Sequence, residues 1–250
     1  MNDRCRHAVE QVAKRSDAPH MKARGRPDGV PGYGAVCLRS ALVSHAPEFV
    51  YLELPKVACT SLKQALGSAL GVPQERIATW RRYGLPVVDL AGPQLRALPR
   101  FSFVRNPWDR LVSCWENKFN HPDPRSAQQR VYAERYARHL GVPRVDFELF
   151  VRMVCSTTDD QSDPHWRSQV WSLTDLRGES LVTCVGRFEQ LAEDFETLCA
   201  QLGLRASLPR AQVTAHRRKD YRSYYTPETA AAVAQRYATD IESLGYSFDR

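Results

Sequence analysis

The strongest chemical signal in this sequence is the segment Pro-Lys-Val-Ala-Cys-Thr-Ser-Leu-Lys, residues 55–63. An apolar, β-rich run comes directly before it, and apolar residues recur at helical spacing after it. The segment is therefore expected to join a strand to a helix, whose first N–H groups lack partners and carry the positive end of the helix dipole. Thr60 and Ser61 add hydroxyl donors. Lys56 and Lys63 add charge, so that the whole segment suits a doubly charged anion.

The same segment contains no glycine, unlike the GxxxxGK[ST] loop that binds nucleoside triphosphates. A nucleotide kinase or another phosphate-loop enzyme is therefore a weaker alternative, and it would require Mg²⁺-dependent ATP binding. An ordinary capped turn with surface lysines accounts for the segment equally well when it is considered alone.

A second segment with anion-binding residues strengthens the first. Arg105 follows the short β-rich run 101–104, and Pro107 suits the first turn of a helix. Ser113 comes eight residues after Arg105 on that helix. An arginine fork and a hydroxyl from neighbouring elements can together hold one phosphate. The alternative is a salt bridge at the start of the helix and a serine that faces solvent.

The remaining sequence predicts the elements that would hold these segments. Apolar runs at 49–54, 101–104 and 181–186 predict three buried strands, each followed by a helical pattern. This alternation predicts an α/β fold with a central, mainly parallel sheet flanked by helices. Thr226 and Pro227 predict the cap and the first turn of a final helix.

The composition of the protein indicates the charge of the partners that it binds. The 250 residues carry a formal charge of +7 with a pI near 9.1, and arginine outnumbers lysine by 29 to 6, so anionic partners are expected. A nucleic-acid-binding protein is the main alternative outside the enzymes. Zinc-finger spacing, an RNP-type motif and a long basic helix are missing from the sequence, and only residues 217–225 interleave basic and aromatic side chains. No nucleic-acid partner is therefore expected.

The spacing of the cysteines and the length of the apolar runs indicate the cellular compartment in which the protein is expected. The seven cysteines include no CxxC pair, so neither a disulfide framework nor a structural zinc site is expected, and no metal is required. No signal-peptide pattern and no run of about 18 apolar residues is found. The sequence is therefore expected to be cytoplasmic, without stable membrane insertion. No heptad pattern indicates an oligomer.

The two anion-binding segments resemble those of sulfotransferases that use 3'-phosphoadenosine 5'-phosphosulfate (PAPS). Residues 54–63 are similar to the 5'-phosphosulfate loop, and residues 103–113 are similar to the 3'-phosphate motif. Pro-Lys-Val-x-Cys-Thr together with Val-Arg-Asn-Pro resembles the carbohydrate branch, sulfotransferase family 2, which includes chondroitin and HNK-1 enzymes. Three weaker similarities, to bacterial members of that branch, lie at 163–166, 186–189 and 224–228. The resemblance spans residues 48–249 and implies a P-loop-like sulfotransferase fold.

This resemblance implies a role for each matching residue. Lys56 would stabilise the leaving phosphate as the S–O bond breaks. Arg105 and Ser113 would bind the 3'-phosphate, with Lys219 as a further contact. The product would be 3'-phosphoadenosine 5'-phosphate (PAP). The 5' end of the donor would be bound by the residues that open the helix: Ala58, Cys59, Thr60, Ser61 and Lys63.

Sulfuryl transfer to a hydroxyl also requires a general base. His165 is the preferred candidate, because imidazole titrates near neutral pH and the similar branch has a histidine in a His-Trp motif. A structural histidine that bonds a backbone group is the alternative. Three further candidates are His121, Glu116 and Asp160.

The acceptor is expected to be a carbohydrate or a glycosylated metabolite, with a glycolipid or a peptide as alternatives. Animal members of the branch carry a membrane anchor and disulfides, so their acceptors are not transferred to this chain. Residues 1–34 are predicted to form a flexible basic arm and 35–250 a single domain, in which 119–180 would build the acceptor pocket or a lid. A nucleotide-binding protein without turnover is disfavoured by the intact Lys56.

Overall fold

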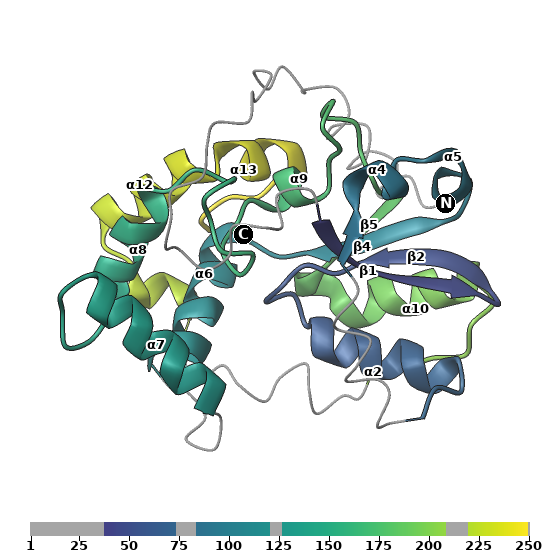
Figure 1. Cartoon of the computed structure of the whole chain (residues 1–250), viewed down its shortest axis with the longest axis horizontal. Helices are drawn as coiled ribbons and strands as arrows, with labels where there is room; N and C mark the ends of the chain where they lie inside the picture. Colours follow the sequence, from purple (N-terminus) through teal and green to yellow (C-terminus); the bar gives the residue numbers. More distant parts are fainter. Residues whose placement is uncertain (1–37, 74–83, 121–126, 209–219, 250) are drawn as a thin grey trace.

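The computed structural model describes residues 38–73, 84–120, 127–208 and 220–249 (Figure 1). Within these ranges, a sheet with flanking helices forms one half of the molecule and a lobe of helices forms the other. The predicted arm, residues 1–34, lies outside the described part of the chain.

The described strands form one sheet of five, in the order β3-β1-β2-β4-β5. They are β1 (Leu38–His45), β2 (Glu48–Leu52), β3 (Gly84–Pro86), β4 (Arg100–Val104) and β5 (Cys184–Arg187). β2, β4 and β5 run parallel, whereas β1 pairs antiparallel with both β2 and β3. The three parallel strands are those that the apolar runs predicted, so the α/β fold is confirmed. The antiparallel edge was not predicted.

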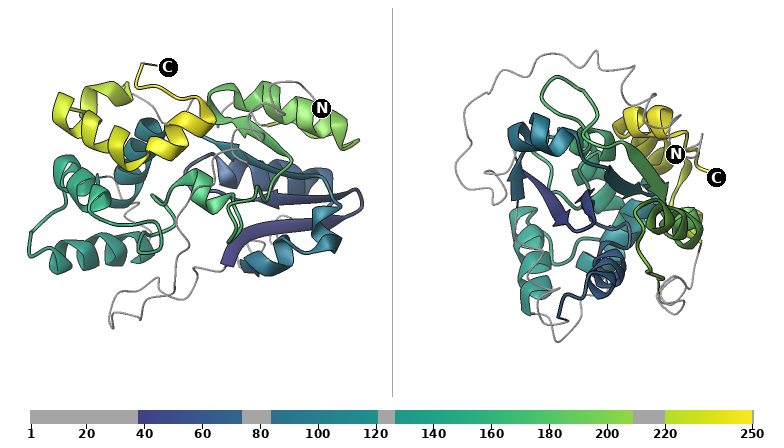
Figure 2. Two further views of the ribbon diagram at one scale, coloured as in Figure 1. Left: turned by 90° about the horizontal axis from the view of Figure 1, so that it is seen from above. Right: turned by 90° about the vertical axis from the view of Figure 1, so that its right-hand side faces the viewer.

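The parallel strands are apolar because both of their faces are buried. Every residue of β4 and four of the five residues of β2 are buried. Helices α2 (Cys59–Ala69) and α10 (Leu191–Gln201) lie along one side of the sheet, as Figures 1 and 2 show. Aromatic rings fill the core between them: the ring centroids of Tyr51 and Phe101 are 5.3 Å apart, and Phe103 lies 6.4 Å from Phe195.

The other half of the molecule has a separate, aromatic-rich core. Its helices are α6 (Pro107–Trp115), a π-helical turn η2 (Glu116–Asn120), α7 (Ala127–His139), α8 (Phe147–Cys155), α9 (Gln169–Ser172), η4 (Tyr221–Tyr224), α12 (Pro227–Arg236) and α13 (Ala238–Leu244). The π-helical turn places Phe119 in this core, with its ring 5.1 Å from that of Phe150. Between residues 119 and 180, where an acceptor pocket is predicted, the described helices α7 and α8 supply much of this helical lobe (Figure 1).

Helix α6 connects the two halves and begins at the predicted place. Asn106 is its N-cap and accepts hydrogen bonds from the backbone N–H groups of Trp108 and Asp109, while Pro107 occupies the first turn. Thr226 likewise caps α12, with a reciprocal bond to Thr229. The predicted final helix is interrupted at Tyr237 and is completed by α13.

Two short helices complete the sheet half: α4 (Val87–Leu90) and α5 (Pro93–Arg96) lie on the side of the sheet opposite α2 (Figures 1 and 2). In the part of the chain that the structure describes, no helix has the length and apolarity needed to cross a membrane. The same residues contain no group of three or more His, Cys, Asp or Glu side chains arranged to hold a metal ion.

Candidate functional site

The loop after β2 has a backbone shaped to receive an anion. Lys56 and Ala58 both have positive φ, 71° and 61°, on either side of the fully buried Val57. Alternation of this kind turns successive N–H groups toward one concave side. Such a conformation is strained for residues other than glycine, and strain of this type concentrates at functional sites. The absence of glycine from this segment therefore did not prevent the turn.

Helix α2 begins directly after this loop with an open N-terminus. Its N-cap residue, Ala58, has no side chain that could accept a hydrogen bond, and its first turn contains no acidic residue. The first turn carries Cys59, Thr60 and Ser61, as the sequence predicted. Burial raises the pKa of the Cys59 thiol, so this cysteine is not a reactive thiolate at neutral pH. N–H groups and the helix dipole are thus available to an anion.

Lys56 is half-buried and, within the described ranges, its ammonium group has neither a hydrogen-bond acceptor nor an acidic partner. Burial lowers its pKa to about 8, an effect opposed by Cys114 and reinforced by the nearby positive charge of Arg105. An uncompensated cation at the N-terminus of a helix is the electrostatic signature of a site for a negatively charged ligand.

Arg105 joins the second predicted motif to the first. Because β2 and β4 are neighbouring parallel strands, their carboxyl ends meet at one edge of the sheet. Nη1 of Arg105 donates to the Lys56 carbonyl at 2.9 Å, and Nη2 pairs with Asp109 at 2.9 Å. Its guanidinium carbon lies 3.9 Å from the centroid of the Phe188 ring. Burial lowers its pKa to about 10, and its buried Nε has no partner among the described residues.

The backbone of Arg105 is fixed by Gln169, a residue that the sequence did not single out. The Arg105 N–H donates to Oε1 of Gln169 at 2.9 Å, and the Arg105 carbonyl accepts from Nε2 at 2.8 Å. Gln169 is fully buried, and its own N–H donates to Asp240 at 2.8 Å. This chain of bonds holds the arginine turn against the helical lobe. Nothing in the sequence near Gln169 signals it, because its partners lie 64 and 71 residues away.

The other predicted phosphate contacts differ in their placement. Ser113 is half-buried and lies one helical turn beyond Asp109, on the same side of α6. Lys219 lies outside the described residues, and so does His121.

Lys63 does not fit the predicted anion-binding role. Its Nζ pairs with Oε1 of Glu53 at 2.6 Å, and the residue is only 2% exposed. Glu53 also accepts from Ser40 at 3.2 Å. The expectation that Lys63 adds charge to the site is therefore corrected: its ammonium is held by a carboxylate beneath the loop, where it neutralises a partly buried acid.

His165, the predicted base, lies in the irregular segment between α8 and α9. Its Nδ1 is 2.6 Å from Oδ1 of Asp163, and its backbone N–H donates to the same oxygen at 2.9 Å. Its side chain is 30% exposed. Among the other candidate bases, Glu116 accepts from the Tyr224 hydroxyl at 2.8 Å and from Asn120 at 3.3 Å. Asp160 lies earlier in the same segment as His165.

Arg110 holds the Lys56 loop and the His165 segment together. Its buried guanidinium donates to three carbonyls: Pro55 at 3.1 Å, Pro164 at 3.3 Å and Arg167 at 2.7 Å. The first acceptor precedes Lys56, and the other two flank His165. Sequence reasoning missed this residue because its acceptors are backbone atoms, which leave no pattern of residue types.

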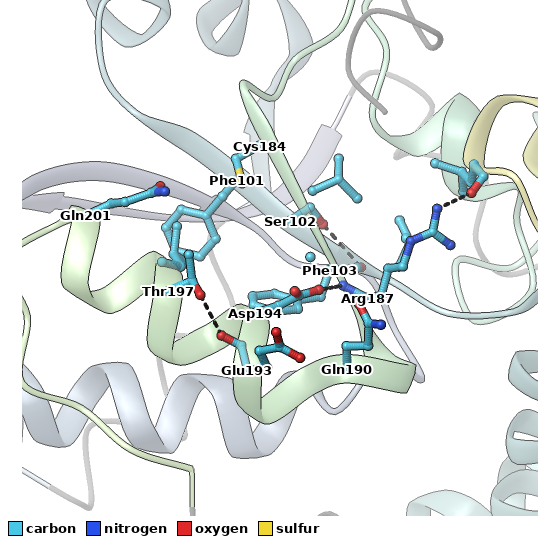
Figure 3. A pocket seen from close by; sticks show the side chains of 15 residues that line it. Phe101, Ser102, Phe103, Cys184, Arg187, Gln190, Glu193, Asp194, Thr197 and Gln201 are labelled. Atoms are coloured by element: carbon cyan, nitrogen blue, oxygen red, sulfur yellow. Dashed lines mark hydrogen bonds between the residues drawn. The ribbon is translucent and has the colours of Figure 1, made fainter. Parts of the chain in front are cut away.

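A separate pocket lies between α10 and the strands β4 and β5 (Figure 3). Figure 3 shows Asp194, Glu193 and Thr197 of α10 facing Arg187 and the strands. Arg187 is itself engaged, because its guanidinium donates to the Leu244 carbonyl and its backbone N–H donates to Asp194. Neither Lys56 nor His165 is among the residues that line this pocket, so it is distinct from the site at the ends of β2 and β4.

Comparison with known proteins gives one family and several relatives. The model of the "Sulfotransferase family" matches residues 39–247. Rattus norvegicus carbohydrate sulfotransferase 11 is 28% identical over 192 residues, 63% of this chain and 51% of that protein. Mus musculus carbohydrate sulfotransferase 14 is 32% identical over 150 residues, 54% of this chain and 39% of that protein. Mus musculus carbohydrate sulfotransferase 12 is 27% identical over 207 residues, which are 67% of this chain and 48% of that protein.

This chain spans about half the length of the curated relatives that it matches first. No solved structure matches it.

Proposed function

The chain belongs to the sulfotransferase family, and from that premise we propose that it transfers a sulfuryl group from PAPS to a hydroxyl of a carbohydrate or glycosylated acceptor. One observation carries the proposal. Arg105 donates to the backbone carbonyl of Lys56, whose ammonium has no acidic partner among the described residues, and both residues lie beside the open N-terminus of α2 at the ends of β2 and β4. The carbohydrate class rests on the names of the relatives, carbohydrate sulfotransferases 11, 12 and 14.

The donor would lie across both motifs. Backbone and hydroxyl groups of Ala58, Cys59, Thr60 and Ser61 would hold its 5' phosphosulfate at the start of α2. Arg105 would bind the 3'-phosphate through its unpaired Nε and through Nη2, which pairs with Asp109 in the structure. The remaining 3'-phosphate contacts that we propose are Ser113 and Lys219.

The reaction would be an in-line displacement in which the protein supplies position and charge. His165 removes the proton from the acceptor hydroxyl as its oxygen bonds to sulfur. The bond between sulfur and the bridging oxygen of the donor breaks, and PAP departs with the negative charge. Lys56 stabilises this charge, since a cation that is not neutralised by a protein carboxylate acts most strongly on a developing anion.

Calorimetric titration with PAP tests the proposal, with 5'-AMP as the comparison ligand. We expect PAP to bind and 5'-AMP to bind far more weakly, and Arg105→Ala to weaken PAP binding roughly 10- to 100-fold through the loss of charge-assisted hydrogen bonds. Arg96→Ala is the matched control, because this exposed arginine of α5 pairs with Asp175 and Glu179 away from the site. Equal affinity for the two nucleotides would overturn the proposed donor.

A further inference from the structure

Asp163 makes contacts on both of its carboxylate oxygens. Oδ1 lies 2.6 Å from Nδ1 of His165 and accepts from the His165 backbone N–H at 2.9 Å. Oδ2 accepts from the hydroxyl of Tyr132, on α7, at 2.9 Å. The Tyr132 hydroxyl and the His165 backbone N–H thus hold the carboxylate of Asp163 in place, and the carboxylate in turn orients the His165 imidazole.

The charge state of this group of residues determines which nitrogen of His165 carries the proton. Burial raises the pKa of Asp163. Its hydrogen bonds and charge interaction with His165, together with the hydrogen bond from Tyr132, lower the pKa by more than burial raises it, so the pKa of Asp163 is below the usual value. Asp163 is therefore ionised at neutral pH and can only accept hydrogen bonds. Nδ1 of a neutral His165 must then carry the hydrogen, and Nε2 is the basic nitrogen.

Tyr132 supports this arrangement from the helical lobe. Burial and the Asp163 charge raise the pKa of its hydroxyl, so it remains a donor. Its ring lies 6.2 Å from the His165 ring and 4.9 Å from that of Tyr136, and the Lys118 ammonium lies 5.0 Å from its centroid. The charge of Asp163 also acts on three further titratable groups: Tyr136, Cys114 and Arg167.

The segment that carries His165 is held on both sides. Arg110 donates to the carbonyl of Pro164, and the Tyr237 hydroxyl donates to the carbonyl of Trp166. Nε2 lies on the opposite side of the ring from Nδ1 and so points away from Asp163. The side chain retains 30% exposure, so the imidazole is not closed off from a substrate hydroxyl.

We propose that Asp163 is the positioning residue that holds His165 in the Nδ1–H tautomer with Nε2 available as the base, and that Tyr132 secures Asp163. This inference rests on the proposed function of His165 as the general base. Asp163 itself does not touch the acceptor in this arrangement, and no proton is transferred to it.

The first test uses nitrogen chemical shifts of the imidazoles, with the His165 signals assigned by their loss in His165→Gln. In the wild-type protein at alkaline pH, where imidazole is neutral, we expect protonated Nδ1 and unprotonated Nε2. Asp163→Asn presents an amide that can donate to Nδ1, so we expect the other tautomer, with the hydrogen on Nε2. Protonated Nε2 in the wild-type protein would overturn the proposal, and so would an unchanged tautomer in Asp163→Asn.

The second test is kinetic. We expect Asp163→Asn to lower kcat roughly 10²-fold or more, the scale of general-base catalysis, with PAP binding preserved, and Tyr132→Phe to have a smaller effect in the same direction. Full kcat in this variant would sink the proposal.

Asp159→Asn is the matched control for damage to the segment. Asp159 accepts from Arg236 at 2.7 Å and from the Ser168 N–H at 2.8 Å, so its loss should lower stability without changing the tautomer of His165. The same tautomer change in Asp159→Asn would show that Asp163 has no special role. His165→Ala tests the role of His165 as the base separately from the role of Asp163 in setting its tautomer. Full turnover in His165→Ala would reject His165 as the base even if the tautomer is as proposed.

Discussion

At the residue scale, Lys56 and Lys63 show how the same residue type takes opposite roles seven positions apart. Lys63 is buried against Glu53, whereas Lys56 is half-buried without a carboxylate. The pKa of Lys56 falls from 10.5 to about 8 on folding. Between these values the unfolded chain binds more protons, so this group makes stability rise with pH across that window. Below pH 8 the cost of holding the charge is fully present.

Lys56→Met should therefore stabilise the folded protein at pH 7, by about 1–3 kcal/mol, while it abolishes turnover. Lys63→Met should instead destabilise the folded protein, by about 3 kcal/mol, because it leaves the partly buried carboxylate of Glu53 without a positive charge. Denaturant unfolding at pH 7 measures both. A loss of stability in Lys56→Met equal to that in Lys63→Met would contradict the assignment of Lys56 as an uncompensated cation.

Ligand binding should reverse the effect of burial on Lys56. A bound anion favours the charged ammonium and raises its pKa, so PAP binding should take up a proton above about pH 8 and weaken as the pH rises further. Titrations in two buffers of different ionisation enthalpy at pH 8.5 measure this uptake. Proton uptake that persists unchanged in Lys56→Met would assign it to another group.

At the scale of elements, the sequence predicted what depends on local pattern. The buried parallel strands were found because their residues are apolar on both faces, and the start of α6 was found because Asn106 and Pro107 have local preferences there. Strand β1 was missed because it contains a buried charge. Arg39 is tolerated in it only because its guanidinium donates to the carbonyls of Trp171, Ser172 and Thr174, more than 130 residues away.

The same limit applies to the candidate site. The sequence pointed to Lys56, Arg105 and His165 through residue type and spacing, and the structure brings the first two into direct contact through a backbone carbonyl. It did not point to Arg110 or Gln169, which act through distant backbone atoms. It assigned Lys63 to the anion because the Glu53 partner becomes close only when β2 and α2 pack together.

Arg110 and Arg39 can be compared to test whether a buried arginine that binds backbone carbonyls serves stability alone or also aligns the candidate site. Each buried guanidinium donates to three carbonyls, but only Arg110 connects the Lys56 loop with the His165 segment. Lysine cannot reach three acceptors in this geometry. Both Arg110→Lys and Arg39→Lys should lose about 1–3 kcal/mol of stability. Only Arg110→Lys should lower kcat, roughly 10-fold or more, through misplacement of the two segments.

Kinetics at saturating substrates, below the unfolding range of both variants, separates these effects. If kcat falls equally in the two variants, general loss of stability explains the result, and the alignment role of Arg110 is rejected.

At the scale of the whole molecule, two cores are joined through polar groups. Asp240 of α13 is fully buried and accepts from Ser168, from the Gln169 N–H and from the Val170 N–H, and Gln169 then holds Arg105 at the end of the sheet. The sequence gives no sign of this junction, since each residue is ordinary in its local context. Only the folded arrangement makes the carboxylate necessary.

Asp240→Asn should accordingly destabilise the protein by about 2–4 kcal/mol, because its amide group would meet an N–H donor in a buried site. It should also weaken PAP binding through Arg105. Asp146→Asn is the control, since Asp146 is the N-cap of α8 and asparagine caps helices equally well. Denaturant unfolding and PAP titration are the measurements, and a near-neutral Asp240→Asn would show that the junction tolerates an amide.

The N-cap of α6 has a consequence for how the protein is made. Asn106 donates to the carbonyl of Ser247, 141 residues later, and the Trp108 ring packs 5.5 Å from that of Phe248. At ordinary rates of translation, on the order of ten seconds pass between synthesis of these partners. A nascent chain on the ribosome thus holds both anion-binding motifs before it can close the turn that aligns them.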